Sequence, residues 1–219
     1  MSAPLIIDCM QGSPAWCAAR AGRLTGSVAS AILATLKTGG EPAARRDLRT
    51  QLALERITGG PIAEDSYTNA DMARGTALEP AARAAYEQRS GALVRQVGFL
   101  QHPELLAGCS PDGLIDEDGL LEIKCPRPAN HLRLVRAGTV VPSEHLPQIT
   151  HNLWIAGADW CDYVSYCPLF PAPLDLIVIR VLASSLDLAA YELAARLFLG
   201  EVDAEVAAIN RLLTERRDQ

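Results

Sequence analysis

A β-hairpin near the middle of the chain is the clearest signal in the pattern of apolar and polar residues. Residues 113–115 and 120–124 are apolar-rich runs on either side of the polar residues 116–119, which end in an Asp-Gly pair. An Asp-Gly pair between two such runs is a strong hairpin signal. Side chains alternate between the two faces of a strand. Leu121, Ile123 and Cys125 therefore face one side, and Glu122 and Lys124 face the other.

Capping signals and periodicity predict further elements on both sides of the hairpin. Ser13 is suited to cap a helix that has Pro14 at its first position, and Gly91 is a stop signal for an alanine-rich helix. The expected helices are residues 14–20, 28–36, 43–57, 81–87, 145–154, 186–199 and 201–216, with the last two separated near Gly200. The other expected strands are residues 5–7, 92–100, 163–166 and 174–182.

The length and composition of the chain fit one folded domain. Its 219 residues are enough for a sizeable core, and 49% of them are hydrophobic while 21% are charged. We see no linker long enough to divide the chain, so we expect a single domain over residues 1–219. The C-terminal helices, about residues 186–216, are expected to pack on the core or against a neighbouring subunit.

The hairpin also brings two carboxylates and an amine together. Asp112 stands at the mouth of the first strand, from which it can approach Glu122 on the second. Two carboxylates in a cleft repel each other, and Mg²⁺ or Mn²⁺, which prefer hard oxygen ligands, offset that repulsion. A lysine beside the metal, here Lys124, can orient or deprotonate a water, and this set of groups fits phosphodiester hydrolysis. Taken alone, Glu122 and Lys124 fit the solvated face of an edge hairpin equally well.

Polar residues outside the hairpin have both a structural and a functional interpretation. Glu79 is expected in the first turn of the helix over residues 81–87, where a carboxylate compensates the helix dipole. Gln148, His151 and Asn152 share one face of a later helix. Such a stripe is typical of a solvated face, but it can also line a cleft.

A phosphate pocket is predicted close to the N-terminus. Thr25 or Ser27 can cap the helix over residues 28–36, and a helix N-terminus attracts anions. With Arg20 opposite, Ser27 can form a pocket for a phosphate group. Trp16, which precedes Arg20 by one helical turn, is expected to anchor packing and not to stack on a base.

The net charge of −6 does not exclude a nucleic-acid substrate. A binding groove is local, and bound metal ions offset the charge of acidic ligands. Basic residues gather in two groups, each of which fits either a solvated helix face or contact with DNA phosphates. The first group lies between Lys37 and Arg56 and includes Arg45, Arg46 and Arg49, and the second consists of His131, Arg133 and Arg136.

Cysteine spacing and hydropathy set further limits. None of the six cysteines forms a C-x-x-C pair, which argues against a structural zinc site and against an iron–sulfur cluster, and favours buried free thiols. No apolar run approaches the roughly 20 residues that span a bilayer, and residues 1–8 lack the pattern of a signal peptide. We therefore expect a cytoplasmic protein with no membrane partner.

Several segments in a fixed order together resemble the lambda-exonuclease-type (YqaJ-like) family of viral recombination nucleases, within the PD-(D/E)xK superfamily. The resemblance extends over about residues 11–167, and its motifs are specific as a series. The motifs are residues 12–16, 20–27, 75–79, 109–113, 121–126 and 147–149.

The resemblance implies an α/β (α+β) fold with a restriction-endonuclease-like core, in which helices flank a central mixed β-sheet. It also implies magnesium-dependent digestion of linear duplex DNA from 5′ to 3′, which leaves 3′ single strands for recombination by annealing. Manganese is expected to substitute for magnesium, with two ions in each site.

The resemblance also implies residue roles. By position, Asp112, Glu122 and the Ile123 carbonyl match metal ligands. Glu79 matches a further ligand, direct or through water. Lys124 matches the residue that positions the attacking water, and Gln148 a polar residue that assists it. These five residues are the expected catalytic and metal-binding set: Glu79, Asp112, Glu122, Lys124 and Gln148, with the carbonyl of Ile123.

Arg20, Ser27 and Ser110 match residues that hold a terminal 5′-phosphate. One departure concerns Asn130, which stands where the family's best-known member has a further arginine. Arg127 or His131 is a candidate replacement, so a preference for phosphorylated ends is less secure than cleavage itself. The resemblance further implies a ring-shaped homotrimer on double-stranded DNA ends and a single-strand annealing protein as partner.

Two other functions compete with an exonuclease. A structure- or sequence-selective DNA endonuclease can share the same metal site, and closed circular DNA as substrate separates the two. A protein that binds DNA ends without cleaving them is expected to have lost a metal ligand or the lysine, and all of these positions are intact.

Overall fold

The computed structural model describes residues 3–36, 39–62, 70–138 and 140–217 of the chain. The elements follow in the order β1 (Leu5–Ile7), α1 (Pro14–Arg20), β2 (Leu24–Thr25), the 3-10 turn η1 (Gly26–Val28), α2 (Ala29–Leu33), α3 (Ala43–Thr58), α4 (Ala70–Ser90), β3 (Val94–Arg95), β4 (Phe99–Gln101), β5 (Ala107–Cys109), β6 (Gly113–Ile115), β7 (Gly119–Lys124), α5 (Pro128–Ala137), α6 (Leu146–Ala156), β8 (Trp160–Tyr166), β9 (Leu176–Leu182), the 3-10 turn η2 (Ala183–Ser185) and α7 (Leu188–Arg217).

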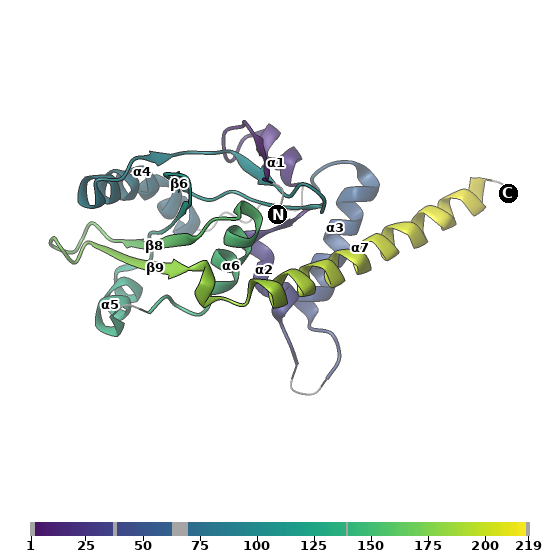
Figure 1. Cartoon of the computed structure of the whole chain (residues 1–219). Coiled ribbons are helices and arrows are strands. Elements are labelled where there is room, and N and C mark those ends of the chain that lie inside the picture. Colours follow the sequence, from purple (N-terminus) through teal and green to yellow (C-terminus); the bar gives the residue numbers. More distant parts are fainter. Residues whose placement is uncertain (1–2, 37–38, 63–69, 139, 218–219) are drawn as a thin grey trace.

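Two mixed β-sheets flanked by helices confirm the predicted α/β fold (Figure 1). The larger sheet has the strand order β3-β6-β7-β8-β9, and only the β7–β8 pair is parallel. The smaller sheet has the order β1-β4-β5-β2, with β2 and β5 parallel. The expected continuous strand over residues 92–100 is wrong, because the chain passes from β3 in one sheet to β4 in the other. At the crossing, Gly98 runs so close to the Cys9 carbonyl of the segment after β1 that a Cβ would overlap it.

The predicted hairpin is confirmed as β6 and β7, with Ile115 opposite Gly119 and a left-handed Asp116 (φ 50°) in the turn. Its two faces pack against different helices. Leu121 and Ile123 join a buried cluster with residues of α4. Leu120, on the opposite face, joins a cluster with residues of α5 and α6. The hairpin is therefore covered on both sides.

Helix α4 begins eleven residues earlier than expected, at Ala70 and not at Ala81. Pro80 lies inside the helix, where a proline removes one hydrogen bond to the preceding turn but does not always end the helix. The prediction that Glu79 occupies a first turn is wrong, so compensation of the helix dipole does not explain this carboxylate. Helix α2 is shorter than expected and has no side-chain cap, so neither Thr25 nor Ser27 caps it.

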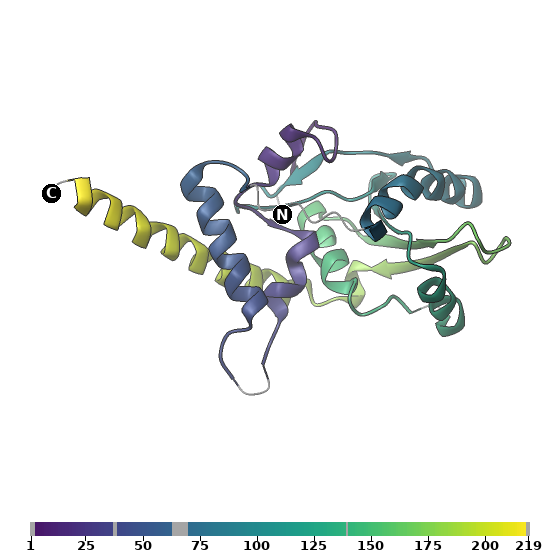
Figure 2. The same cartoon turned by 180° about the vertical axis from the view of Figure 1, so that it is seen from behind.

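The C-terminal segment is one helix, α7, and not two helices separated at Gly200. A glycine inside a helix costs about 1 kcal/mol relative to alanine. Phe198, Leu199 and Val202 are buried on both sides of Gly200, and burial of this apolar face outweighs that cost. Beyond the region that packs on α3, the helix projects away from the body of the molecule (Figures 1 and 2).

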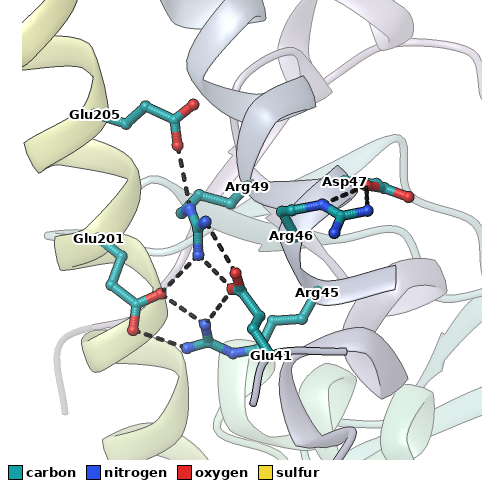
Figure 3. A network of polar contacts seen from close by, with 7 residues as sticks. All are labelled: Glu41, Arg45, Arg46, Asp47, Arg49, Glu201 and Glu205. Carbon is teal, nitrogen blue, oxygen red and sulfur yellow. Dashed lines mark hydrogen bonds and ion pairs between the residues drawn. The ribbon is translucent and has the colours of Figure 1, made fainter. Parts of the chain in front are cut away.

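Arginines of α3 hold the middle of α7 through ion pairs (Figure 3). Arg45 pairs with Glu201 at 2.6 Å, and Arg49 pairs with Glu205 at 3.1 Å. Glu41, before α3, pairs with both arginines. The first basic group is therefore largely neutralised by carboxylates of the chain itself, and these arginines do not form an open basic surface. Lys37 lies outside the described residues.

All six cysteines are free, and Cys109, Cys161 and Cys167 are buried, as expected for thiols that pack as small apolar groups. Among the described residues, no helix combines the length and the apolar character needed to cross a membrane.

Candidate active site

Asp112 is fixed against the second strand of the hairpin by two hydrogen bonds. Its backbone N–H donates to the Leu121 carbonyl at 3.0 Å. Its Oδ2 atom accepts from the backbone N–H of Ile123 at 2.5 Å. Asp112 is thus bound to β7 on either side of Glu122, through its backbone and its carboxylate, which confirms the predicted approach of the two acidic residues.

Glu122 is only 1% exposed, and both of its carboxylate oxygens accept hydrogen bonds. Lys124 Nζ donates to Oε1 at 2.6 Å, and Asn152 Nδ2 donates to Oε2 at 3.1 Å. The Lys124 amine also donates to Gln148 Oε1 at 3.1 Å. Helix α6 therefore covers the polar face of β7. The interpretation of Glu122 and Lys124 as a solvated face of an edge hairpin is wrong.

The electrostatics of this cluster are dominated by burial. Burial raises the pKa of the Asp112 carboxyl well above its usual value, and the charge of Glu122 adds to this effect. Burial also raises the pKa of Glu122, although Lys124 opposes the shift. Burial alone would lower the pKa of Lys124, but Glu122 and Asp112 raise it overall. The site therefore keeps its amine protonated, while burial disfavours the ionised form of both carboxyl groups.

Glu79 reaches the same region from α4. Burial makes the largest contribution to the raised pKa of Asp112 and of Glu122, and the charge of Glu79 also raises both. Glu79 therefore lies within electrostatic range of these two carboxyl groups. Its carboxylate accepts a hydrogen bond from Arg83, one helical turn further along α4. In the part of the chain that the structure describes, no three acidic, histidine or cysteine side chains are already gathered as a metal site. The roles of these residues and of the Ile123 carbonyl as metal ligands stay predictions.

A second polar site surrounds Arg20 at the end of α1. Its Nη2 atom donates to Ser27 Oγ at 3.2 Å and to Thr25 Oγ1 at 3.3 Å. The guanidinium also lies over the ring of Trp16, 4.1 Å from the ring centroid. Within the described residues, no carboxylate forms an ion pair with Arg20, and a cavity of about 210 Å³ adjoins it. We call this site the Arg20 pocket. Glu55 lines the same cavity and lies within electrostatic range of the guanidinium, but its carboxylate accepts hydrogen bonds from Gly22 and Gln51. A cation with hydroxyl neighbours and no ion-paired carboxylate is suited to bind an anion.

Trp16 joins the Arg20 pocket to the carboxylate cluster. Its indole Nε1–H donates to Ser110 Oγ at 2.8 Å, and Ser110 precedes Asp112 by two residues. The structure thus brings Arg20, Ser27 and Ser110 together around one tryptophan. Trp16 anchors the packing of α1, as expected, and it also provides the link between two predicted sites.

The structure places the other candidates for phosphate binding elsewhere. Arg127 is exposed and pairs with Asp71 of α4, with Nε 2.7 Å from Oδ1. His131 is fully buried, and its ring is hydrogen-bonded to Ser165 Oγ and to the Leu174 carbonyl. His131 is therefore wrong as a replacement for the missing arginine, and it is not part of a basic surface.

The sequence left open whether Asn152 belongs to a solvated helix face or to a functional site. Two residues of the stripe, Gln148 and Asn152, contact the polar face of β7, while His151 lies in the core, hydrogen-bonded to Gly108 and Tyr191. The spacing of Gln148 and Asn152, one helical turn apart, was the only signal that both side chains reach β7.

Gly26 lies directly against Asn152. A Cβ at this position would overlap the Asn152 amide oxygen and stand 3.3 Å from Gln148 Cγ. The turn η1, which carries Gly26, also carries Ser27 of the Arg20 pocket. A larger residue at position 26 would have to displace the Asn152 amide, so the glycine lets η1 pack closely on α6 beside both predicted sites.

Comparison with known proteins gives one family match. The model of the YqaJ-like viral recombinase domain matches residues 15–159. Two structures of the alkaline exonuclease LHK-Exo from Laribacter hongkongensis, one of them in complex with dAMP, are 32% identical in sequence, with TM-scores of 0.82 and 0.81. Each alignment covers 93% of this chain and 99% of that protein. A phage-related exonuclease from Haemophilus somnus 129PT shares the fold at 13% identity, with a TM-score of 0.61 over 85% of this chain and 96% of its own. No curated protein matches the chain.

Proposed function

The chain belongs to the YqaJ-like viral recombinase family, and from that premise we propose that it is a magnesium-dependent exonuclease. It degrades linear double-stranded DNA from 5′ to 3′ and leaves 3′ single strands for recombination by annealing. The observation that carries this proposal is the pair of Glu122 and Lys124, held on a covered strand with Asp112 anchored alongside. The relative LHK-Exo is an alkaline exonuclease with a structure in complex with dAMP, and a deoxynucleoside monophosphate is what exonucleolytic cleavage of DNA releases.

The residues present fit a divalent cation. Asp112, Glu122 and Glu79 offer hard carboxylate oxygens, and burial raises the pKa of Asp112 and Glu122. A cation would offset that cost and keep both carboxylates ionised. In our proposal these residues and the Ile123 carbonyl hold Mg²⁺, with Mn²⁺ as a substitute and two ions in the full site. Bound metal supplies Lewis-acid polarisation of the phosphodiester and a more acidic water.

The chain's own groups would orient the attacking water. Lys124 Nζ, which bridges Glu122 and Gln148, keeps one donor for a water or a phosphate oxygen, since an ammonium group has three. Among the described residues, no group bonds to the Gln148 amide N–H₂, which can therefore orient the same water. Glu79 accepts the Arg83 hydrogen bond through Oε1, so its other carboxylate oxygen can contribute directly or through a water.

The Arg20 pocket is proposed to hold the terminal 5′-phosphate. Arg20 supplies the charge, while Ser27 and Ser110 supply hydroxyl donors, in agreement with the contacts within the pocket and through Trp16. Arg127 is the weakest member of the predicted set, because Asp71 already occupies its guanidinium.

Assembly forms a further part of the proposal. We expect a homotrimeric ring that encircles duplex DNA and works with a single-strand annealing protein. The projecting half of α7 offers exposed apolar side chains for contact with another chain, namely Ile209, Leu212 and Leu213. Light scattering after size exclusion tests the stoichiometry, and a mass of one chain (23.5 kDa) would reject the trimer.

One digestion experiment tests the activity and its polarity. A linear duplex labelled separately at the 5′ and 3′ ends is incubated with Mg²⁺ or with EDTA, beside a closed circle. Early Mg²⁺-dependent release of the 5′ label, with the circle intact, is the expected result. Nicking of the circle would show that the protein is an endonuclease. Early release of the 3′ label would show digestion from 3′ to 5′, and no cleavage of either DNA would reject the proposed nuclease activity.

A further inference from the structure

A second cavity, of about 650 Å³, lies between α5 and the start of α6, beside β8. We call it the α5–α6 cavity. It shares no lining residue with the Arg20 pocket, and α6 lies between α1 and α5 in both views of the molecule (Figures 1 and 2). The carboxylate cluster is attached to α6 through Gln148 and Asn152. The two cavities therefore have separate linings, and the start of α6, the helix that contacts the carboxylate cluster, lines the second one.

The α5–α6 cavity adjoins the catalytic face of β7. In the parallel pairing of β7 and β8, Glu122 is opposite Tyr163 and Lys124 is opposite Ser165. Tyr163 and Ser165 both line the cavity. His145, on the other wall, is close enough to Lys124 that the charge of this lysine adds to burial in lowering the pKa of the imidazole. A ligand in this cavity is thus a neighbour of the phosphodiester bond that Lys124 would face.

The walls of the cavity have the composition of a site for a nucleotide base. The His145 ring stacks on Tyr163, with the ring centroids 5.4 Å apart and the planes 27° apart. Tyr163 is only 2% exposed, so His145 is the ring that offers a face to a ligand. Leu134 and Val141 add apolar wall. The volume lies within the range of small-molecule sites, which is about 300–1,000 Å³.

Polar groups at the edge of the cavity can contact the base edge and the phosphate of a nucleotide. Asn130 and Arg133 line it from α5, and Arg133 Nη1 donates to Asn130 Oδ1 at 2.9 Å. An amide can hydrogen-bond a base edge, and a guanidinium can contact a backbone phosphate. Helix α5 contains no acidic residue, and Glu144 is the one carboxylate among the lining residues.

We propose that the α5–α6 cavity binds the nucleotide on the 3′ side of the cleaved bond, unpaired from its complement, with its base stacked on His145. The proposal rests on the proposed exonuclease function. The strand then runs from the Arg20 pocket, past Asp112 and Glu122, into the α5–α6 cavity. His145 would hold the second nucleotide in place while the first is released.

Coupling between one side chain and one base tests the proposal. Single-turnover release of the first nucleotide is measured on a 5′-phosphorylated duplex, either intact or with an abasic second nucleotide. Base–aromatic stacking contributes enough for a loss of about tenfold when either partner is removed. We expect His145→Ala and the abasic substitution each to slow the wild-type reaction about tenfold, and together to slow it no further. Losses that multiply would overturn the proposal.

Two controls separate stacking from other roles. His145→Phe keeps an aromatic ring without ring nitrogens and is expected to restore the wild-type rate and its sensitivity to the abasic site. If His145→Phe is as slow as His145→Ala, the ring does not act by stacking and the proposal is wrong. An abasic site at the eighth nucleotide should not change the rate at which the first nucleotide is released. If it slows this release as much as an abasic second nucleotide does, the proposal that the cavity binds the second nucleotide is also wrong.

Binding without cleavage gives an independent measurement. A 2-aminopurine base at the second nucleotide, with Ca²⁺ in place of Mg²⁺, should be quenched in the wild-type complex, because stacking quenches its fluorescence, and not in His145→Ala. Equal quenching in both proteins would overturn the proposal. Cleavage of intact DNA by the wild type reports the exonuclease separately, so failure of the cavity and failure of the proposed function give different results.

Discussion

Replacing Gly26 with alanine tests whether the packing of η1 on α6 maintains the catalytic carboxylate. Gly26 is fully covered, and its backbone is in a conformation that alanine adopts without strain. The added Cβ would overlap Asn152 Oδ1, with Gln148 Cγ at 3.3 Å. The Asn152 side chain is 2% exposed and has little space to move except by rotation away from Glu122.

The magnitude follows from the contacts that are lost. A hydrogen bond to a charged group contributes about 1.5–3 kcal/mol, and overpacking of a filled interior costs roughly 1–3 kcal/mol. We therefore expect Gly26→Ala to lower the free energy of unfolding by about 3 kcal/mol. In a chain of this size such a loss lowers the melting temperature by about 6–12 °C. Nuclease activity should fall as well, since Gln148 and Glu122 both lose their fixed positions.

Thermal unfolding with two further variants measures this effect. Gly200→Ala is the matched control, because a Cβ at Gly200 meets no atom within 4 Å and the residue lies inside α7. This change should stabilise the protein by about 1 kcal/mol. If Gly26→Ala acts through Asn152, the double variant Gly26→Ala/Asn152→Ala should be little less stable than Asn152→Ala alone. Additive losses, or a neutral Gly26→Ala, would refute the reasoning.

Three other predictions concern the chemistry and the core. Lys124→Ala is expected to abolish DNA hydrolysis, because the amine proposed to orient the attacking water is lost. The protein should still fold, because the lysine side chain is partly exposed. Digestion assays and circular dichroism check these two expectations, and full activity would reject the catalytic role of Lys124. Arg20→Ala should reduce the preference for 5′-phosphorylated over 5′-hydroxyl ends without changing metal affinity, as measured by competition between the two substrates and by calorimetry; an unchanged preference would reject the Arg20 pocket. Burial lowers the pKa of His151 to about 4 from an ordinary value of 6.5, so the unfolded chain binds a proton at higher pH than the native one. This contribution to stability is present above pH 6.5 and is lost as the pH falls toward 4, with a total of about 3 kcal/mol. Urea unfolding between pH 7 and 4 should show this loss in the wild type and a smaller one in His151→Gln, and parallel curves would contradict it.

Local signals in the sequence were sufficient for the hairpin and for the first helix. The alternation of residues 120–124 and the turn before them specify which side chains share a face, because the side-chain period of a strand is fixed by its backbone. Ser13 caps α1 with its hydroxyl, as its position before a proline predicted. The order of Asp112, Glu122 and Lys124 was visible for the same reason, since all three belong to one local unit.

Helix boundaries were less accessible, because they depend on what the helix packs against. Pro80 and Gly200 are both signals that end or interrupt isolated helices. In this protein α4 continues through Pro80, and α7 continues through Gly200. The extended part of α4 is held by Arg74, which donates to the Cys125 carbonyl at 2.7 Å, and burial of Phe198 and Val202 in the core favours the longer α7. Propensity is a weak effect beside such burial.

The sequence by itself determined the fold class, the hairpin and the identity of the carboxylates and the lysine. Only the tertiary structure decided which partners these groups have. It joined Glu122 to Asn152, 30 residues away, and used Arg45 to hold α7, 156 residues away. The physical reason is that a charged side chain on a helix or strand has the same local pattern whether it faces water, a substrate or another part of the chain. Its partner is fixed only when burial brings distant elements together and every covered polar group must find a hydrogen bond.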